Sequence, residues 1–214
     1  MSTAETLAHI ERVKIVAILR GDYRGAWLDI GAALIEGGVT AVEVTFTCPD
    51  ALEVIRALAD RYGTQAAIGA GTVLTADEVA RAVDAGATYM IAPNVNTDVI
   101  ACCVDNDVLA VPGAYTPTEI EFAYRSGAGL VKLFPAMPIG PDYLKAIRGP
   151  FPDIPIMATG GVTLENIPEF VKAGANAIGM GSVLVGADAL KPGGLGRVCE
   201  RAQRAISQAG SISS

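Results

Sequence analysis

Histidine is almost missing from this chain of 214 residues. Its single histidine, His9, lies upstream of the first predicted strand. With no second imidazole, the sequence offers no histidine base for catalysis and no histidine-rich zinc site. The four cysteines, at positions 48, 102, 103 and 199, lack CxxC spacing, so we expect reduced thiols that contribute to packing. The run Gly69-Ala-Gly-Thr-Val-Leu74 lacks the last glycine of a dinucleotide-binding motif, so we do not expect NAD. A Mg²⁺ site made of carboxylates alone is the open alternative, but the sequence shows no clustered candidates for it, and we expect neither a metal nor another cofactor.

Basic residues are also scarce. The 16 lysines and arginines are outnumbered by 23 aspartates and glutamates, for a formal charge of −7. An acidic surface gains nothing from nucleic acid or an anionic membrane, so we expect neither partner, whereas a small anionic metabolite can still bind in a locally positive pocket. The longest stretches without a charged residue, 62–76 and 173–187, are short and broken by glycine, which excludes a spanning helix. No secretory signal is recognisable at the start, and we expect a cytoplasmic location.

Glycine, in contrast, is abundant, at 24 residues. Four similar segments each read as a helix that ends at a glycine and leads into a short buried strand. Their glycines, at positions 38, 86, 127 and 174, are separated by about two strand–helix units each. Further apolar runs at 14–20, 66–71, 108–112 and 154–159 raise the number of predicted strands to eight.

These strands are apolar throughout, which is typical of a parallel sheet covered by helices. Eight such units predict an α/β protein with a (β/α)8 barrel, or TIM barrel, and an open doubly wound sheet is the alternative. The length predicts a single barrel domain over residues 1–214, with a short N-terminal helical extension and a C-terminal helix. Predicted helix starts are Pro49, Pro141, Thr163 and the capping boxes that begin at Thr75 and Thr116.

Lys132 is the most informative polar residue, because it is one of five lysines and lies in an apolar strand. Catalytic groups of such barrels project from the carboxyl ends of strands. A buried lysine without a partner loses its proton more readily, and the neutral amine attacks ketones to form a Schiff base. The alternative is an internal ion pair with Glu43.

Glu43 is the second charged residue inside a predicted strand. Burial raises the pKa of a carboxyl group towards neutrality, where it can transfer protons, although a structural ion pair remains the alternative. A lysine nucleophile and one carboxyl group that donates and accepts protons are the minimum set of catalytic groups for imine chemistry.

Glycines follow the last two predicted strands, in Thr159-Gly-Gly161 and Gly179-Met-Gly-Ser182. Backbone N–H groups at this position form the recurrent phosphate site of the barrel fold, and tight turns are the alternative explanation.

Nine short motifs in order along nearly the whole chain support a more specific interpretation. Together they resemble the 2-keto-3-deoxy-6-phosphogluconate (KDPG) aldolase and 4-hydroxy-2-oxoglutarate (KHG) aldolase family. The motifs are Val16-Ala-Ile-Leu-Arg20, Glu43-Val-Thr-Phe-Thr47, Gly69-Ala-Gly-Thr-Val73, Ile91-Ala-Pro93, Val111-Pro-Gly113, Thr116-Pro-Thr-Glu119, Val131-Lys-Leu-Phe-Pro135, Gly149-Pro-Phe-Pro152 and Ala158-Thr-Gly-Gly-Val162.

The resemblance implies a metal-free class I aldolase, homotrimeric in its best-known members, that reversibly cleaves KDPG to pyruvate and glyceraldehyde 3-phosphate. It assigns the Schiff base to Lys132 and acid/base catalysis to Glu43. The remaining implied roles are carboxylate binding for Arg20, further substrate contacts for Thr45, Thr47, Thr72, Pro93, Phe134 and Thr159, and phosphate binding for Gly160, Gly161, Gly181 and Ser182. Thr47 stands where some members have a carboxylate-binding arginine. Arg20 is therefore expected to provide a larger share of the carboxylate binding.

Three other functions stay open at this point. A related aldolase could prefer the 6-phosphogalactonate epimer or unphosphorylated 4-hydroxy-2-oxoglutarate. A phosphosugar isomerase or epimerase would use Glu43 as base without a covalent adduct. A non-catalytic trimeric scaffold would retain the site without using it.

Overall fold

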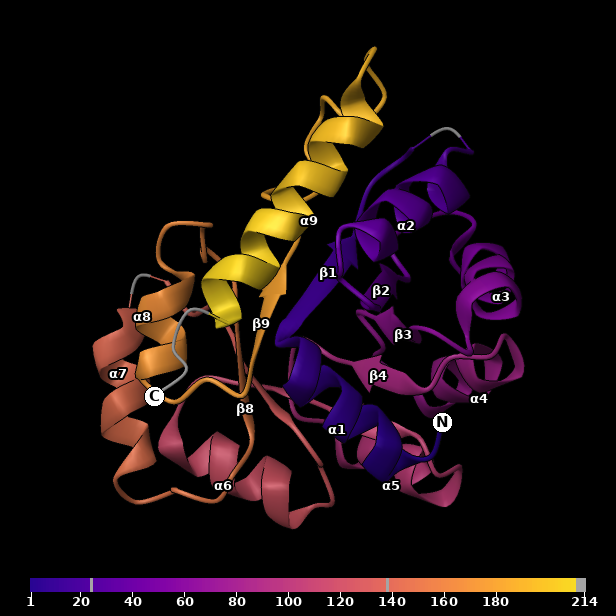
Figure 1. The fold of residues 1–214 in the computed structure, drawn as a ribbon. Helices are drawn as coiled ribbons and strands as arrows, with labels where there is room; N and C mark the ends of the chain where they lie inside the picture. Colours follow the sequence, from indigo (N-terminus) through magenta and orange to yellow (C-terminus); the bar gives the residue numbers. More distant parts are fainter. Residues whose placement is uncertain (24, 138, 211–214) are drawn as a thin grey trace.

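The computed structural model describes residues 1–23, 25–137 and 139–210. Helices and strands alternate along the chain (Figure 1). In order they are α1 (Thr3–Val13), β1 (Ile15–Leu19), α2 (Trp27–Glu36), β2 (Ala41–Thr45), α3 (Ala51–Tyr62), β3 (Ala67–Gly71), α4 (Ala76–Asp84), β4 (Tyr89–Ile91), α5 (Thr97–Asp105), β5 (Leu109–Val111), β6 (Gly113–Ala114), α6 (Pro117–Arg125), β7 (Val131–Leu133), α7 (Gly140–Arg148), β8 (Ile156–Thr159), α8 (Ile167–Lys172), β9 (Ala177–Met180) and α9 (Gly194–Gly210).

All strands are parallel and form one sheet in the order β5-β4-β3-β2-β1-β9-β8-β7-β6. Its two end strands, β5 and β6, are joined through the single residue Pro112, so they are two halves of one predicted strand. Val111 O accepts a hydrogen bond from Ala92 N on one side (3.1 Å), and Pro112 O accepts one from Lys132 N on the other (2.9 Å). The divided strand therefore closes the sheet into the predicted (β/α)8 barrel, and the open doubly wound alternative is wrong.

Two apolar layers surround the sheet. The outer layer lies between the strands and the helices, whereas the inner one fills the barrel. In Figure 1, α1 lies at the centre of the ring of helices, and it contacts β1, β2, β3, β5 and β9. Ile10 of α1 is part of the inner cluster, which also contains Val16, Tyr89 and Met157, and Leu7 packs against it. This helix therefore covers the barrel interior at the amino ends of the strands, and only the carboxyl ends are left for a site.

The helix ends follow local sequence chemistry. Both predicted capping boxes, at Thr75 and Thr116, are formed with Glu78 and Glu119. The start predicted at Pro141 agrees with α7 to within one residue. The structure describes no helix long and apolar enough to cross a bilayer.

The start predicted at Thr163 is wrong. The side chain of Asn166 accepts the Thr163 N–H at 2.8 Å, which holds a turn, and α8 begins after it at Ile167. The four predicted stop glycines do end helices, and each has a positive φ of 90° to 109°, a conformation that glycine adopts without a steric penalty.

His9 connects α1 to the segment that precedes β2. Its Nε2 lies 2.9 Å from Thr40 O and 2.9 Å from Thr40 Oγ1, and Arg12 Nη2 lies 2.9 Å from Nδ1. Because the guanidinium must donate to Nδ1, the ring is neutral and carries its proton on Nε2. Burial lowers the pKa of His9, and the charge of Arg12 lowers it further, against the opposing effect of the Thr40 hydrogen bond.

We predict that acidification through the histidine range destabilises the protein in part through His9. The unfolded chain, with an ordinary histidine pKa, binds this proton at a higher pH than the native state does, so stability is full above that pKa and is lost as the pH falls below it. The urea concentration at the midpoint of unfolding should therefore decrease when the pH is lowered from 7.5 to 5.5. The decrease should be smaller in His9→Gln than in the wild type. Equal falls in both proteins would contradict the prediction.

Candidate active site

A cavity of about 360 Å³ opens at the carboxyl ends of β1, β7, β8 and β9. Eight of the predicted site residues border it. They are Arg20, Lys132, Phe134, Thr159, Gly160, Gly161, Gly181 and Ser182. The fold therefore gathers in one place residues that the sequence spreads over more than 160 positions.

Sequence reasoning missed several residues of the same cavity. Most are apolar or backbone contributors, namely Ile18, Val162, Gly179, Met180, Val183 and Val185, together with Thr163. Tyr23 is the exception, because it brings an aromatic ring and a hydroxyl group from the loop after β1. No motif or spacing marks it in the sequence.

Glu43, Thr45, Thr47, Thr72 and Pro93 do not border this cavity. The hydroxyl oxygens of Thr45 and Thr47 lie 2.7 Å apart, and Thr45 Oγ1 donates to Leu19 O at 3.3 Å. These hydroxyls are engaged with the protein, so a role in substrate binding stays a prediction.

Thr72 and Pro93 follow the carboxyl ends of β3 and β4. Thr72 has a φ of 59°, an unusual conformation for a β-branched residue and one found most often at functional positions. Pro93 is exposed, and its backbone packs against Gly113, where an added Cβ would lie 2.4 Å from the Pro93 carbonyl oxygen.

Lys132 is at the centre of β7, with 5% of its surface exposed. Burial lowers the pKa of its amine; Glu43 raises it and Arg20 lowers it. The Nζ atom lies 4.7 Å from the centre of the Phe134 ring. Within the described residues no ion pair of 4.0 Å or less joins Lys132 to Glu43, so the internal ion pair considered as an alternative is not formed. The site therefore makes the amine easier to deprotonate than a lysine in water.

Glu43 is on β2 and is 1% exposed. Burial raises the pKa of its carboxyl group, whereas the charges of Lys132 and Arg20 lower it. Its Oε2 has no hydrogen-bond partner among the described residues. An added Cβ on Gly71 would lie 1.8 Å from Oε1, so the missing side chain at position 71 gives the carboxyl group its room.

Tyr89 shares a row of the barrel interior with Glu43. Glu43 pairs with Gly69 on β3, and Gly69 pairs with Tyr89 on β4. The Tyr89 ring occupies the space over Gly69, where an added Cβ would lie 2.3 Å from the ring. The phenol oxygen is buried without a partner in the described part of the chain, and burial raises its pKa well above the usual value. No motif or spacing in the sequence marks Tyr89 as different from the other residues of its strand.

Part of the cavity wall, after β8 and β9, is made of backbone. Gly160 and Gly161 have φ values of 94° and 83°, and an added Cβ on Gly161 would lie 2.5 Å from the Met137 side chain. After β9, the N–H groups of Leu184 and Val185 donate to Gly181 O at 2.9 and 3.0 Å and form a turn. The N–H groups of Gly161, Ser182 and Val183 donate to no acceptor among residues 1–23, 25–137 and 139–210, which leaves them for a ligand anion.

Thr159 is the last residue of β8 and also borders the cavity. Its Oγ1 is buried without a partner in the described residues, and Gly179 leaves room for it, since an added Cβ there would lie 2.3 Å away. The described part of the chain contains no group of three or more histidine, cysteine, aspartate or glutamate residues arranged to hold a metal ion.

Comparisons with known proteins agree with this geometry. Residues 7–200 match the model of the KDPG and KHG aldolase family. The chain belongs to this family of aldolases. This confirms the resemblance seen in the sequence and makes the protein a carbon–carbon lyase.

Relatives of this aldolase differ in the substrates that they are named for. The 2-dehydro-3-deoxy-6-phosphogalactonate aldolase of Escherichia coli K12 is 37% identical over 174 residues, 81% of this chain and 85% of the relative. The 2-dehydro-3-deoxy-phosphogluconate aldolase of Pseudomonas aeruginosa is 38% identical over 159 residues, 74% and 72% of the two chains. A structure of the KDPG aldolase of Legionella pneumophila, with pyruvate captured as a covalent carbinolamine, has a TM-score of 0.84 at 26% identity and covers 98% of both chains.

We predict that the Glu43→Gln variant of this aldolase has a lower Lys132 pKa than the wild type. The carboxylate stabilises the ammonium, so its loss leaves burial and the charge of Arg20 to favour the neutral amine. The pH dependence of Lys132 acetylation by acetic anhydride, followed by peptide mass, measures this pKa. Glu121→Gln is the matched control, because its carboxylate pairs with Arg125 at the surface of α6 and its loss should not move the midpoint. A midpoint that rises in Glu43→Gln would contradict the prediction.

Proposed function

We propose that this aldolase is a class I enzyme that cleaves KDPG to pyruvate and glyceraldehyde 3-phosphate through a Schiff base on Lys132. The observation that carries the proposal is the buried Lys132 amine, which has no ion-pair partner within 4.0 Å among the described residues and borders the cavity. The wall of free backbone N–H groups in the same cavity supports a substrate with a phosphate group.

The first half of the reaction forms the imine. The neutral Lys132 amine attacks C2 of the keto acid to give a carbinolamine, and Glu43, acting through a water molecule, protonates the leaving hydroxyl group. Water departs, an iminium ion remains on Lys132, and Glu43 is left as a carboxylate. The raised pKa of Glu43 supports this step, because it increases the protonated fraction near neutral pH.

The second half breaks the C3–C4 bond. The Glu43 carboxylate accepts the proton of the C4 hydroxyl group as the bonding electrons move into the iminium, which yields glyceraldehyde 3-phosphate and the enamine of pyruvate. Protonation of the enamine at C3 and hydrolysis of the imine release pyruvate and restore the amine.

Substrate recognition is divided between side chains and backbone groups of the cavity. Arg20 is proposed to bind the carboxylate, and Thr159 the pyruvate-derived part, to which its free hydroxyl can donate. Gly160, Gly161, Gly181 and Ser182 are proposed to bind the phosphate. Thr72 is a further contact for the pyruvate part, while Pro93 and Phe134 shape the pocket.

Trapping with pyruvate and sodium borohydride tests the covalent step. We expect intact-mass analysis to show one pyruvate-derived addition, located on Lys132 by peptide mapping, because reduction makes the imine permanent. Lys132→Ala should show no adduct and no turnover while keeping its circular dichroism spectrum. Glu43→Gln should lower kcat by about 10²- to 10⁴-fold.

Absence of an adduct in the folded wild type would overturn the proposal and favour the isomerase or scaffold alternatives. Comparison of kcat/KM for KDPG, its galactonate epimer and 4-hydroxy-2-oxoglutarate then decides the substrate. We expect KDPG to give the highest value, and a higher value for either competitor would reassign the substrate within the family.

We also propose that the protein is a homotrimer, and the support is an apolar surface on α5 and α6. Val104 and Phe122 are 56% and 50% exposed, and Tyr124 is exposed as well. Val104 of α5 lies near the turn that follows α6, since an added Cβ on Gly127 would lie 3.1 Å from Val104 Cγ2. Exposed apolar side chains of this size indicate a surface that is covered in solution.

Sedimentation velocity should therefore give three times the chain mass of 22.0 kDa for the wild type. Phe122→Glu should give the mass of a single chain, because burying an unpaired carboxylate between subunits is costly. Leu195→Glu is the matched control on α9, where we expect the trimer to persist. A trimeric Phe122→Glu variant would exclude this surface as the interface.

A further inference from the structure

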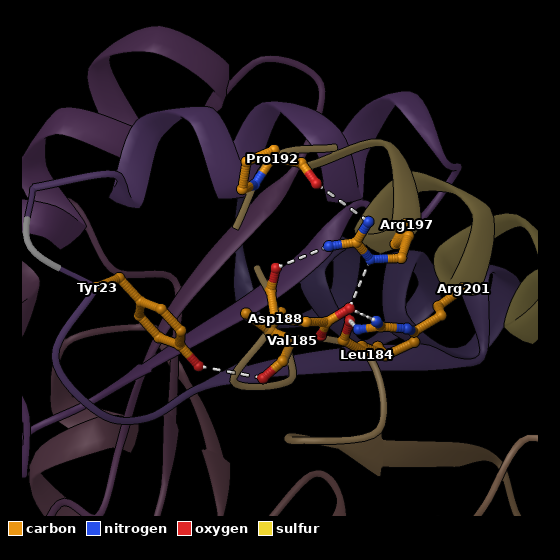
Figure 2. Close-up of polar contacts among 7 residues, drawn as sticks. All are labelled: Tyr23, Leu184, Val185, Asp188, Pro192, Arg197 and Arg201. Atoms are coloured by element: carbon orange, nitrogen blue, oxygen red, sulfur yellow. Dashed lines mark hydrogen bonds and ion pairs between the residues drawn. The ribbon is translucent and has the colours of Figure 1, made fainter. Parts of the chain in front are cut away.

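The segment between β9 and α9, residues 181–193, contains the proposed phosphate ligands Gly181 and Ser182 and is fixed at several points. We call it the β9–α9 loop. Figure 2 shows polar contacts that hold it from two sides, one from Tyr23 and one from Arg197 and Arg201 of α9. The loop therefore has a defined shape before any substrate arrives.

Tyr23 provides the contact on the barrel side. Its hydroxyl group lies 3.2 Å from Arg20 O and 3.3 Å from Val185 O, so one O–H group donates to carbonyls that are 165 residues apart in the chain. The ring is held independently of the hydroxyl by an edge-to-face contact with Trp27, at 4.8 Å between ring centres. Tyr23 thus joins the proposed carboxylate end of the cavity to the β9–α9 loop.

The second anchor is an ion pair with α9. Asp188 pairs with Arg197 at 2.7 Å and with Arg201, and these hydrogen bonds hold the pKa of Asp188 at about 2. Arg201 Nη1 also donates to Leu184 O at 3.0 Å. The outer part of the loop is therefore fixed to the helix at any pH used for an aldolase assay.

Between these anchors lies the turn with the free N–H groups of Ser182 and Val183. Backbone donors bind an anion well only when the chain already has the conformation that aims them, since ordering the chain during binding costs affinity. Val185 is the last residue of this turn and is the one that Tyr23 holds.

We infer that Tyr23 is a positioning residue for the phosphate end of the substrate: its hydroxyl fixes the β9–α9 loop relative to Arg20 and so favours phosphorylated keto acids. This inference rests on the proposed function, because it assigns the loop to the substrate phosphate. Tyr23 itself takes no part in bond breaking.

Tyr23→Phe removes the hydroxyl and keeps the ring on Trp27. The loss of one neutral hydrogen bond should raise the KM for KDPG by about three- to tenfold and leave kcat within a factor of two. The KM for unphosphorylated 4-hydroxy-2-oxoglutarate, and the rate of pyruvate methyl exchange in D₂O followed by NMR, should stay at the wild-type values. A merely structural role would change all of these together.

Tyr143→Phe is the matched control, because the Tyr143 hydroxyl also donates to a carbonyl, that of Tyr115 at 2.7 Å, and does not border the cavity. It should behave as wild type with every substrate. Asp188→Asn is a second test variant that weakens the other anchor of the same loop, and we expect the same selective rise in KM for KDPG.

The outcomes separate the inference from the proposed function. A wild type that forms no pyruvate adduct on Lys132 would overturn the proposed function. A wild type that forms the adduct, together with Tyr23→Phe and Asp188→Asn variants that either match its KM for KDPG or lose activity equally with all substrates, would overturn the inference alone.

Discussion

Burial of Lys132 away from water is the constraint on which the rest of the structure depends. An ammonium inside an apolar barrel is costly unless it is neutralised or paired, and here no carboxylate lies within 4.0 Å among the described residues. Part of the cost is therefore met by a lower pKa, which is the property that makes an amine nucleophilic. The closed barrel limits access to this environment to the carboxyl ends of the strands, because α1 covers the other end and the divided strand β5–β6 completes the wall.

Glycines in the strands leave the space that the buried polar groups occupy. Gly69 leaves room for the Tyr89 ring, Gly71 for the Glu43 carboxyl and Gly179 for Thr159. In each case a neighbouring strand contributes the larger side chain that fills the space. The buried polar atoms at positions 43, 89 and 159 have no protein partner in the described residues, so they can interact with a substrate or with internal water. A barrel filled by apolar side chains alone would be more stable but would have no group that could catalyse a reaction.

The sequence predicts much of this, for reasons that lie in local patterns. Apolar strands, stop glycines and capping boxes are local signals, so the barrel and most helix starts follow from them. Lys132 and Glu43 stand out because a charge within an apolar strand is unusual. Tyr23 could not be found in this way, since its acceptor Val185 is 162 residues away and is a backbone carbonyl, which any residue type provides. The same reasoning applies to Thr45 and Thr47, whose hydroxyls look available in the sequence but bond to each other and to Leu19 O.

The proposal assigns the substrate carboxylate to the Arg20 side chain and the phosphate to backbone N–H groups, and this arrangement has an electrostatic reason. Arg20 lowers the pKa of both Lys132 and Glu43, so its charge helps the amine lose its proton but also opposes protonation of the carboxyl group. A further cation at the phosphate end would add to the second effect and reduce the fraction of Glu43 that can protonate the leaving hydroxyl group. Backbone N–H groups bind a phosphate through dipoles without a full charge, whereas Arg197 and Arg201 do not border the cavity and one of their two charges is offset by Asp188. Phosphate binding by a fixed loop therefore leaves the pKa of Glu43 under the control of burial, which is the condition that the proposed imine chemistry requires.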